Sequence, residues 1–422
     1  MVQTLKQKPL GYWLALILLA VPFVYMILVT ELGFSFATIH RFTSIVSFVL
    51  LVLVLKDRRR LLEHCPQVKW LVLSVGLFFL STLAGQLRNF HPLYYLSGLN
   101  NSIPYFVFFF ACILYIPEEE CNGLFRILDG LFWLNFVVSM YQFLVLGLKW
   151  DYLGGIFGVT IGCSSCSNNL LTLVVTISAV RYLNHQEKGW ICLLKCAASL
   201  LIAALAELRM FMLMFAAIVI LGVVMTKFSR QKLYLLIGGA IGVFLAAQLL
   251  CFIFPVWRSF FALDKIIQYS TNESGYMGIG DYIRLTAIPR VWTDFLNSRY
   301  LKVFGLGMGN CDYGFTDALT PAFYFDNYNL HYMLFTSCFI LMETGLVGIL
   351  LYLAFYPLVF LLAHYLERNG KANPVFCQIS KIMVLYSLVL FLYDSSLRTE
   401  DTYLIFFSLV LPFLGTVKNA KQ

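Results

Sequence analysis

Two arginines and one histidine stand out in a long hydrophilic segment that runs from about Pro255 to about Leu334. Arg284 and Arg290 are six residues apart, and His331 directly precedes the next apolar run. A guanidinium keeps its charge at every working pH and can bind phosphate oxygens through two parallel hydrogen bonds. An imidazole is suited to accept a proton near neutral pH. These residue types favour a site that binds an anion and transfers a proton. The structural alternatives are that the two arginines lie on a solvated helix face and that the histidine anchors the chain at the membrane interface.

Other charged residues lie in the shorter polar breaks between apolar runs. Arg209 follows Glu207 at a tight turn and begins an apolar stretch. It is either a snorkelling arginine paired with that carboxylate or a guanidinium fixed beside a cavity. Arg88 and His91 lie in another break, and Arg398 lies in the break DSSLRTED. Polar side chains from these breaks could gather with the long segment around a substrate.

The remaining motifs are weak. The run GLGMGN (Gly305–Asn310) has no preceding strand and no Lys-Ser/Thr, so we interpret it as a tight turn and not as a nucleotide site. The sequence has no HExxH motif, other metal-ligand cluster or assignable pair of facing carboxylates, so we expect no metal and no cofactor. Cys163 and Cys166 lack a second ligand pair, and a disulfide between them or with Cys311 stays open.

The composition identifies the elements that must position these residues. Sixty per cent of the residues are hydrophobic and 12% are charged, with a mean hydropathy of +0.80. Soluble globular chains have about 25% charged residues, so that class is excluded. The apolar runs are continuous over about 17–25 residues, which indicates transmembrane helices and not the alternating strands of a β-barrel.

We therefore predict an all-α polytopic membrane protein with about twelve transmembrane helices and one large extracytoplasmic loop between the ninth and tenth. The predicted spans are 11–29, 37–55, 70–85, 100–116, 124–147, 167–183, 190–206, 210–226, 233–254, 334–363, 376–393 and 402–417. We expect one integral membrane domain, made of helices in 1–254, a loop with short amphipathic helices in 255–333, and helices in 334–422.

Clusters of lysine and arginine predict the orientation of the spans. They precede the first span, follow the second, sixth, eighth and tenth, and close the chain. With twelve spans they all fall on one side, which the positive-inside rule makes cytoplasmic. Both termini are then cytoplasmic and the long loop is extracytoplasmic. Between Pro255 and Leu334 the loop has six basic and seven acidic residues, so its arginines are not orientation signals.

Four stretches, in this order, resemble segments of the O-antigen polymerase and ligase superfamily of membrane glycosyltransferases. The first is Gly155–Gly158 with Asn168–Leu170, similar to G-x-F-G…N-x-L, and the second is Glu207–Arg209, similar to an S-R helix start without its serine. The third is Asp281–Arg284 with Trp292 and Val303–Gly307, similar to G-R…W…F-G-x-G. The fourth is His331–Leu334 with Glu343–Gly348, similar to H-N-x-x-L…E-x-G-x-x-G. The resemblance covers roughly residues 150–360. Tyr332 stands where the ligases usually have asparagine, which favours a polymerase.

The resemblance implies an enzyme that polymerises undecaprenyl-pyrophosphate-linked oligosaccharide repeat units on the outer face of the cytoplasmic membrane, for O-antigen, capsule or exopolysaccharide. It implies transfer with inversion, without a metal or nucleotide sugar. Arginines would neutralise the leaving pyrophosphate, while a base would prepare the acceptor hydroxyl. The implied catalytic residues are Arg209 and Arg284 on the pyrophosphate and His331 on the acceptor. The implied substrate-binding residues are Arg88, Arg290 and Arg398 at the mouth, with Asn169, Tyr282 and Trp292.

Two alternatives stay open. A ligase would move finished glycan to a lipid or protein acceptor, and its deletion would remove all attached glycan, whereas loss of a polymerase would leave single units attached. A transporter or flippase often has internal repeats and ionisable residues near mid-membrane, whereas here such residues crowd the predicted outer edge. The expected partners are the lipid-linked oligosaccharide, membrane lipids, and a chain-length regulator and flippase of the same pathway, with no nucleic acid.

Overall fold

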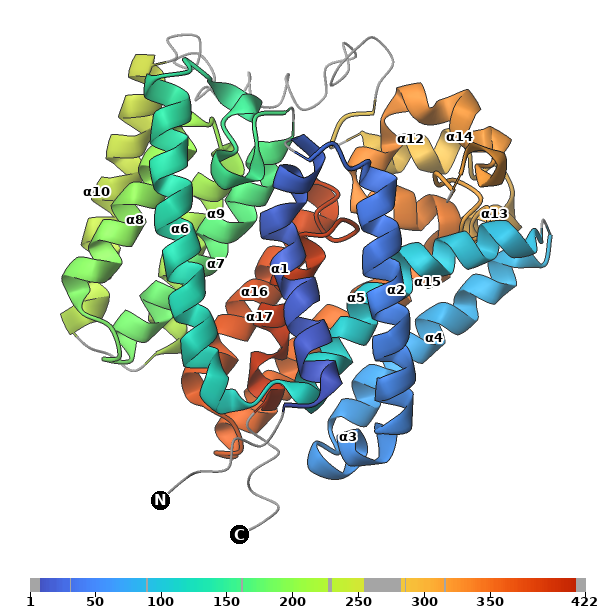
Figure 1. Ribbon diagram of the computed structural model, residues 1–422, viewed down its shortest axis with the longest axis horizontal. Coiled ribbons are helices and arrows are strands. Elements are labelled where there is room, and N and C mark those ends of the chain that lie inside the picture. The colour runs from blue at the N-terminus through green and yellow to red at the C-terminus, as the bar shows by residue number, and fades with distance from the viewer. Residues whose placement is uncertain are drawn as a thin grey trace.

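The computed structural model describes residues 8–30, 32–88, 90–160, 162–226, 230–253, 282–284, 286–314 and 316–414. These residues form helices and connections, without a strand (Figure 1). The long helices are α1 (Leu10–Thr30), α2 (Phe36–Lys56), α4 (Val68–Gln86), α5 (Pro92–Tyr115), α6 (Cys121–Leu144), α7 (Cys163–Leu183), α8 (Gly189–Leu205), α9 (Arg209–Met225), α10 (Arg230–Ile253), α15 (Thr336–Arg368), α16 (Pro374–Tyr393) and α17 (Thr402–Leu414). The short helices are α3 (Arg58–His64), α12 (Ala287–Asp294), α13 (Arg299–Phe304) and α14 (Ala322–Asn327).

Each predicted span coincides with one of the long helices, although several ends differ. α5 begins at Pro92 and not near 100, because proline fits the first helical turn and the polar residues after it are helical without being apolar. In the part of the chain that the structure describes, nine helices are long and apolar enough to cross a membrane, and α8, α9 and α17 are shorter apolar helices. The chain is thus a multi-pass helical membrane protein, and the count of twelve spans stays a prediction.

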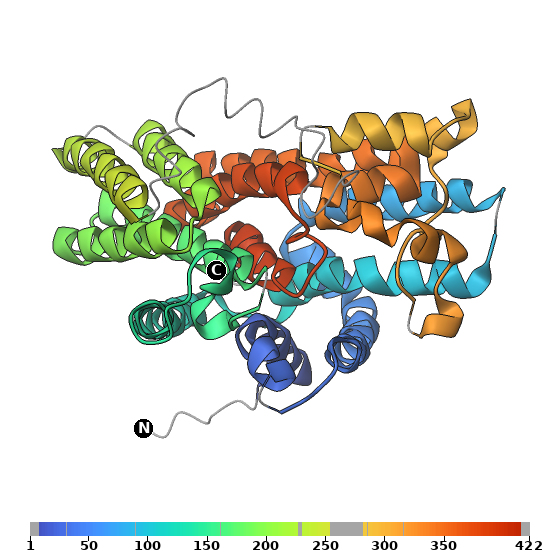
Figure 2. The same ribbon diagram turned by 90° about the horizontal axis from the view of Figure 1, so that it is seen from above.

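The most buried long helices are α5, α7, α16 and α17. α15 packs beside them, between α4 and α16 (Figure 2). α17 is buried along its whole length. Phe106 and Phe109 of α5 meet Phe355 of α15 and Phe406 of α17 at ring-centroid distances of 5.2–6.2 Å, mostly edge to face. Such pairs add about 0.5–1.5 kcal/mol each beyond the burial of their area. This aromatic cluster holds α5, α15 and α17 together, and these helices position the polar connections at their ends.

Polar connections gather at the two ends of the bundle. One end lies around α3, in the lower part of Figure 1, and four hydrogen-bonded pairs join its connections. The pairs are Lys8–Glu120, Tyr115–Asp57, Asn184–Gln378 and Asn373–Glu118. The described members of the basic clusters lie in the connections at this end or in the adjoining helix turns, so they share one end as the spacing predicted. The side of the membrane that this end faces stays a prediction.

The described part of the long hydrophilic segment lies at the opposite end, where α12, α13 and α14 are the short helices expected there (Figure 1). Residues 255–281 of that segment lie outside the described residues. Pro289 occupies the first turn of α12, where its missing N–H has no helical acceptor to lose. α12 and α13 both contact α15, which holds the segment on the bundle.

A break in α15 anchors the end of this segment. Gly345 has a φ of +62°, so the helix is interrupted there and the carbonyl groups before it are released. Leu306 N donates to Met342 O over 2.7 Å, and Gly307 N donates to Glu343 O over 3.0 Å. Gly309 N donates to the carboxyl group of the buried Glu343 over 2.7 Å. The glycine run is the tight turn that the sequence predicted, and it is docked into the broken helix.

Candidate functional site

Two adjoining cavities lie between the connections at the end opposite α3. The first has a volume of about 400 Å³ and lies between α1, the connection before α7, the α8–α9 turn and the α16–α17 connection. The second has a volume of about 380 Å³ and lies between α2, α5, residues 312–314 and the same α16–α17 connection. Five residues line both cavities: Tyr25, Phe36, Ser395, Thr399 and Glu400. The α16–α17 connection, residues 394–401, is therefore their common wall.

Arg284 lines the first cavity, and its role in binding an anion stays a prediction. Its Nε donates to Tyr393 O over 3.3 Å, and its guanidinium lies 4.3 Å from the centroid of the Tyr393 ring. Tyr282 N donates to Leu330 O over 3.0 Å, which joins the backbone beside Arg284 to the backbone beside His331. The structure thus brings these two predicted residues into one region. His331 itself is not among the residues that line either cavity.

Arg209 and Glu207 form the pair that the sequence suggested, with 3.8 Å between Arg209 Nη2 and Glu207 Oε1. Glu207 lines the first cavity in a left-handed backbone conformation with a φ of +59°, and Arg209 begins α9 beside it. Burial raises the pKa of Glu207 to about 7, against the opposing effect of Arg209. Glu207 therefore lies on the cavity wall with Arg209 beside it, and a role of this arginine in binding an anion stays a prediction.

Carboxyl groups dominate the remaining charge of the first cavity, and no role had been predicted for them. Asp151, Asp394, Glu400 and Asp401 line it together with Glu207. Burial is the main cause that raises the pKa of Asp394 and that of Asp401, each to about 6. Because burial disfavours the ionised form, Glu207 is partly protonated near neutral pH.

Asn169 supports this wall from behind. Its Nδ2 donates to Ser396 Oγ over 3.1 Å and to Asp401 Oδ2 over 3.0 Å, and its Oδ1 accepts from the Tyr386 hydroxyl over 2.5 Å. The side chain is buried at 1% exposure and does not line either cavity. Asn169 was predicted to bind substrate, and its observed contacts are those of a residue that holds residues 394–401 in place.

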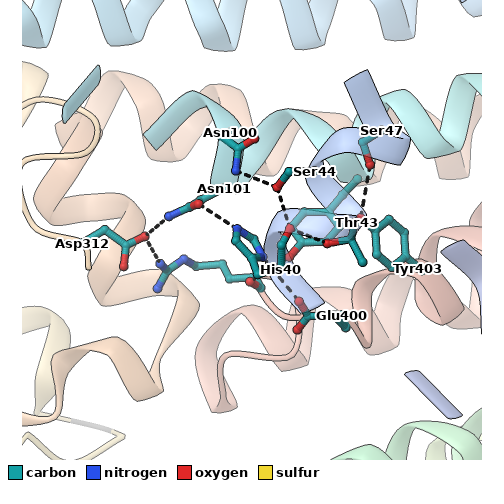
Figure 3. A network of polar contacts seen from close by, with 11 residues as sticks. His40, Thr43, Ser44, Ser47, Asn100, Asn101, Asp312, Glu400 and Tyr403 are labelled. Atoms are coloured by element: carbon teal, nitrogen blue, oxygen red, sulfur yellow. Dashed lines mark hydrogen bonds and ion pairs between the residues drawn. The ribbon is translucent and has the colours of Figure 1, made fainter. Parts of the chain in front are cut away.

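A hydrogen-bonded network forms the wall of the second cavity (Figure 3). Arg398 Nη2 lies 3.1 Å from Asp312 Oδ2, which also accepts from Asn101 Nδ2 over 2.8 Å. His40 Nε2 lies 3.0 Å from Asn101 Oδ1, and His40 Nδ1 lies 3.4 Å from Glu400 Oε1. Of these residues only Arg398 was predicted. The available signal was His40 with Arg41, and Asn100 with Asn101, as polar pairs at the edges of apolar runs.

Of the other predicted residues, Arg290 and Trp292 lie on α12, Tyr282 lies shortly before it and Arg88 follows α4. None of them lines the two cavities. The Arg290 guanidinium lies 4.5 Å from the centroid of the Tyr282 ring, and the Tyr282 hydroxyl donates to Asp294 over 3.1 Å. Tyr282 is fully buried. Lys302 Nζ lies 5.1 Å from the Trp292 ring, and Arg88 Nη1 lies 3.5 Å from Ser298 Oγ. In this conformation these side chains support the fold of the loop.

The cysteines of the site are free thiols in the structure. Cys163 and Cys166 both line the first cavity, and the Cys163 thiol donates to Asp151 O over 3.3 Å. Cys311 is fully buried, and its carbonyl oxygen accepts from the Tyr332 hydroxyl over 2.6 Å. The structure therefore contains none of the disulfides that the spacing had left open.

Asp394 gives the stability of the protein a defined pH dependence. Its pKa in the folded protein, about 6, lies above the ordinary value of 3.8, so the folded protein binds this proton more tightly. The stabilisation is complete below about pH 4 and is lost as the pH rises through about 6. Replacing Asp394 by asparagine removes this contribution while an acceptor for Ser396 N remains.

We expect the fall in melting temperature of the purified protein between pH 4 and pH 7 to be smaller in Asp394→Asn than in the natural protein. The difference in unfolding free energy is about 1–2 kcal/mol. Asp326→Asn, on the exposed face of α14, is the matched control and should follow the natural protein. Parallel curves for the natural protein and Asp394→Asn would contradict the assignment.

No protein-family model matches this chain, and no curated protein matches it either. The fold and the cavities define the class, an all-α multi-pass membrane protein with a polar site at one end. Membership of the O-antigen polymerase and ligase superfamily rests on the quoted motifs and stays a proposal.

Proposed function

We propose that this chain is a membrane glycosyltransferase that lengthens a glycan carried on polyprenyl pyrophosphate, with undecaprenyl-pyrophosphate-linked repeat units as substrates. The observation that carries the proposal is Arg284 on the wall of a cavity of about 400 Å³, among carboxyl and hydroxyl groups, at one end of an apolar helical bundle. A carrier lipid keeps its chain among the helices and its pyrophosphate at such an end. A fixed cation and many hydrogen-bonding groups suit a pyrophosphate joined to a sugar.

The chemistry requires that negative charge developing on the leaving pyrophosphate be neutralised. Arg284 supplies a permanent positive charge at the wall of the first cavity, and Arg209 lies beside the same wall next to Glu207. The raised pKa values of Glu207, about 7, and Asp394, about 6, lower the electrostatic cost of an anion there. In this proposal Arg284 and Arg209 bind the pyrophosphate, whereas His331, which was expected to act on the acceptor, lies outside the lining of both cavities.

The proposed orientation of the protein in the membrane follows from the distribution of its basic residues. The end around α3 holds the basic connections, so the positive-inside rule makes it cytoplasmic. The cavities then face the outer side, where a flippase would deliver lipid-linked repeat units and a chain-length regulator could act. A polymerase is favoured over a ligase because Tyr332, which is buried against Cys311, replaces the asparagine that ligases usually have.

Reconstitution tests the proposed function. The purified protein is placed in liposomes with a polyprenyl-pyrophosphate-linked oligosaccharide as the only glycan, and the products are separated by size. A ladder of products differing by one repeat unit, formed without added metal, is the expected result. Transfer of a single glycan to an added lipid or peptide acceptor, without a ladder, would identify a ligase. Movement of the substrate across the bilayer without any new glycosidic bond would identify a transporter and overturn the proposal.

A further inference from the structure

Glu400 lies where the two cavities meet. It lines both of them, and it belongs to the connection that forms their common wall. The other charged residue of that connection near the second cavity, Arg398, is already paired with Asp312 at 3.1 Å. Asp401 accepts a hydrogen bond from Asn169, and Asp394 accepts one from Ser396 N. Of the three carboxyl groups on this connection, Glu400 is the one that lines both cavities.

The residues behind Glu400 form a directed chain of hydrogen bonds. Asn101 Nδ2 donates to Asp312, so Asn101 Oδ1 is turned towards His40 and accepts from its Nε2–H over 3.0 Å. This contact fixes the tautomer of His40. Its Nδ1 is then the nitrogen that can take up a proton, and it faces Glu400 Oε1 at 3.4 Å. Figure 3 shows these side chains converging from α2, α5 and two connections.

Such an arrangement is suited to accept a proton. A carboxylate at the cavity wall can take a proton from a bound hydroxyl group, and an imidazole behind it with a fixed tautomer can share that proton. Arg398 and Asp312 hold Asn101 and so keep the orientation of the whole chain. His331, which the sequence suggested for this role, does not line either cavity.

We propose that the second cavity binds the acceptor sugar and that Glu400 is the catalytic residue that removes the proton from its hydroxyl group. This inference rests on the proposed glycosyl transfer. The acceptor oxygen forms a bond to the anomeric carbon of the donor sugar, and the bond from that carbon to the pyrophosphate oxygen breaks. The hydroxyl proton passes to Glu400 and is shared with His40 Nδ1, while the polyprenyl pyrophosphate leaves with the electron pair of the broken bond.

This placement assigns one substrate to each cavity. The donor pyrophosphate lies in the first cavity near Arg284, and the acceptor lies in the second cavity beside His40, Asn101 and Glu400. The two sugars meet at the shared wall. His40 is a positioning residue in this scheme, because it acts on the substrate through Glu400.

The test compares Glu400→Gln with the natural protein in the reconstituted elongation assay. Loss of the base is expected to lower kcat by about 100- to 1,000-fold. Donor binding, measured as the shift in melting temperature caused by the lipid-linked oligosaccharide, should stay unchanged. Glu63→Gln, an exposed glutamate on α3 at the other end of the bundle, is the matched control and should elongate normally. Elongation at the natural rate in Glu400→Gln would overturn the inference and leave the proposed function standing.

Two further variants separate catalysis from structure. Formate added to Glu400→Ala should restore part of the elongation rate, because a small carboxylate can replace the missing base. If formate has no effect and donor binding is lost, Glu400 is a binding residue and the inference is wrong. His40→Gln should lower kcat about tenfold with little change in the KM of the donor. A ladder missing from the natural protein itself would overturn the proposed function, and the role of Glu400 with it.

Discussion

Replacing Arg284 by alanine is expected to lower the rate of glycan elongation by about 100- to 1,000-fold, because preorganised charge at a leaving group contributes about 3–4 kcal/mol to transition-state stabilisation. Arg284 is the arginine on the wall of the first cavity, and its Nε and ring contacts with Tyr393 hold it in one orientation. No other cation among the described residues lines that cavity. Arg209 lies beside that wall, paired with Glu207, and is expected to replace Arg284 only in part.

The measurement is the initial rate of ladder formation by reconstituted protein, normalised to the amount of folded protein in the liposomes. Arg299→Ala removes the same charge from the exposed start of α13 and should keep the natural rate. Arg284→Lys keeps a positive charge without the planar pair of donors, so an intermediate rate is expected. A natural rate in Arg284→Ala would remove this residue from the proposed mechanism.

Replacing Gly309 by alanine is expected to have the largest effect on stability. A Cβ atom at this position would lie 1.8 Å from Tyr94 O, and the backbone has a φ of +82°, which side chains rarely adopt. The close backbone atoms cannot yield as a flexible side chain could. Overpacking and backbone strain together should lower the free energy of unfolding by about 3 kcal/mol or more. Loss of monodisperse protein on purification, or a clearly lower melting temperature, is the expected result.

Two other glycines separate the causes of this effect. Gly370 has a φ of +63° with no atom within 4 Å of an added Cβ, so Gly370→Ala should cost only the strain, about 1 kcal/mol. Gly76 lies within α4 with open space around it, so Gly76→Ala should be neutral or slightly stabilising. Equal melting temperatures for Gly309→Ala and Gly370→Ala would show that the docked glycine turn can move away from Tyr94.

The helices could be predicted because the information for them is local. A continuous apolar run long enough for a membrane forms a helix to satisfy its own backbone, whatever surrounds it. The helix ends were less predictable where polar residues continue a helix beyond its apolar part, as in α5. The effect of Pro289 likewise depends on its position within the helix, because α12 begins only two residues before it.

The candidate site was predictable only in part. Arg284, Arg209 and Arg398 stand out because permanent charge in or beside an apolar chain requires a function or a partner. The structure brings Arg284 and Arg398 to adjoining cavities and Arg209 to the edge of one. Asn169 and Tyr282 also stand out, yet their buried contacts support walls and loops. A polar residue type alone does not reveal whether its hydrogen bonds are already satisfied within the fold.

The sequence by itself determined that this chain is a helical, multi-pass membrane protein whose polar residues gather in connections, because hydropathy and helix formation are properties of contiguous residues. Only the tertiary structure decided which connections meet. His40, Asn101, Asp312 and Glu400 come from four distant parts of the chain and form one hydrogen-bonded network between two cavities. Each is ambiguous alone, since a single polar residue at a helix end can simply face water. Their role depends on the packing of the helices, because this packing brings the polar helix ends together and encloses the space between those ends.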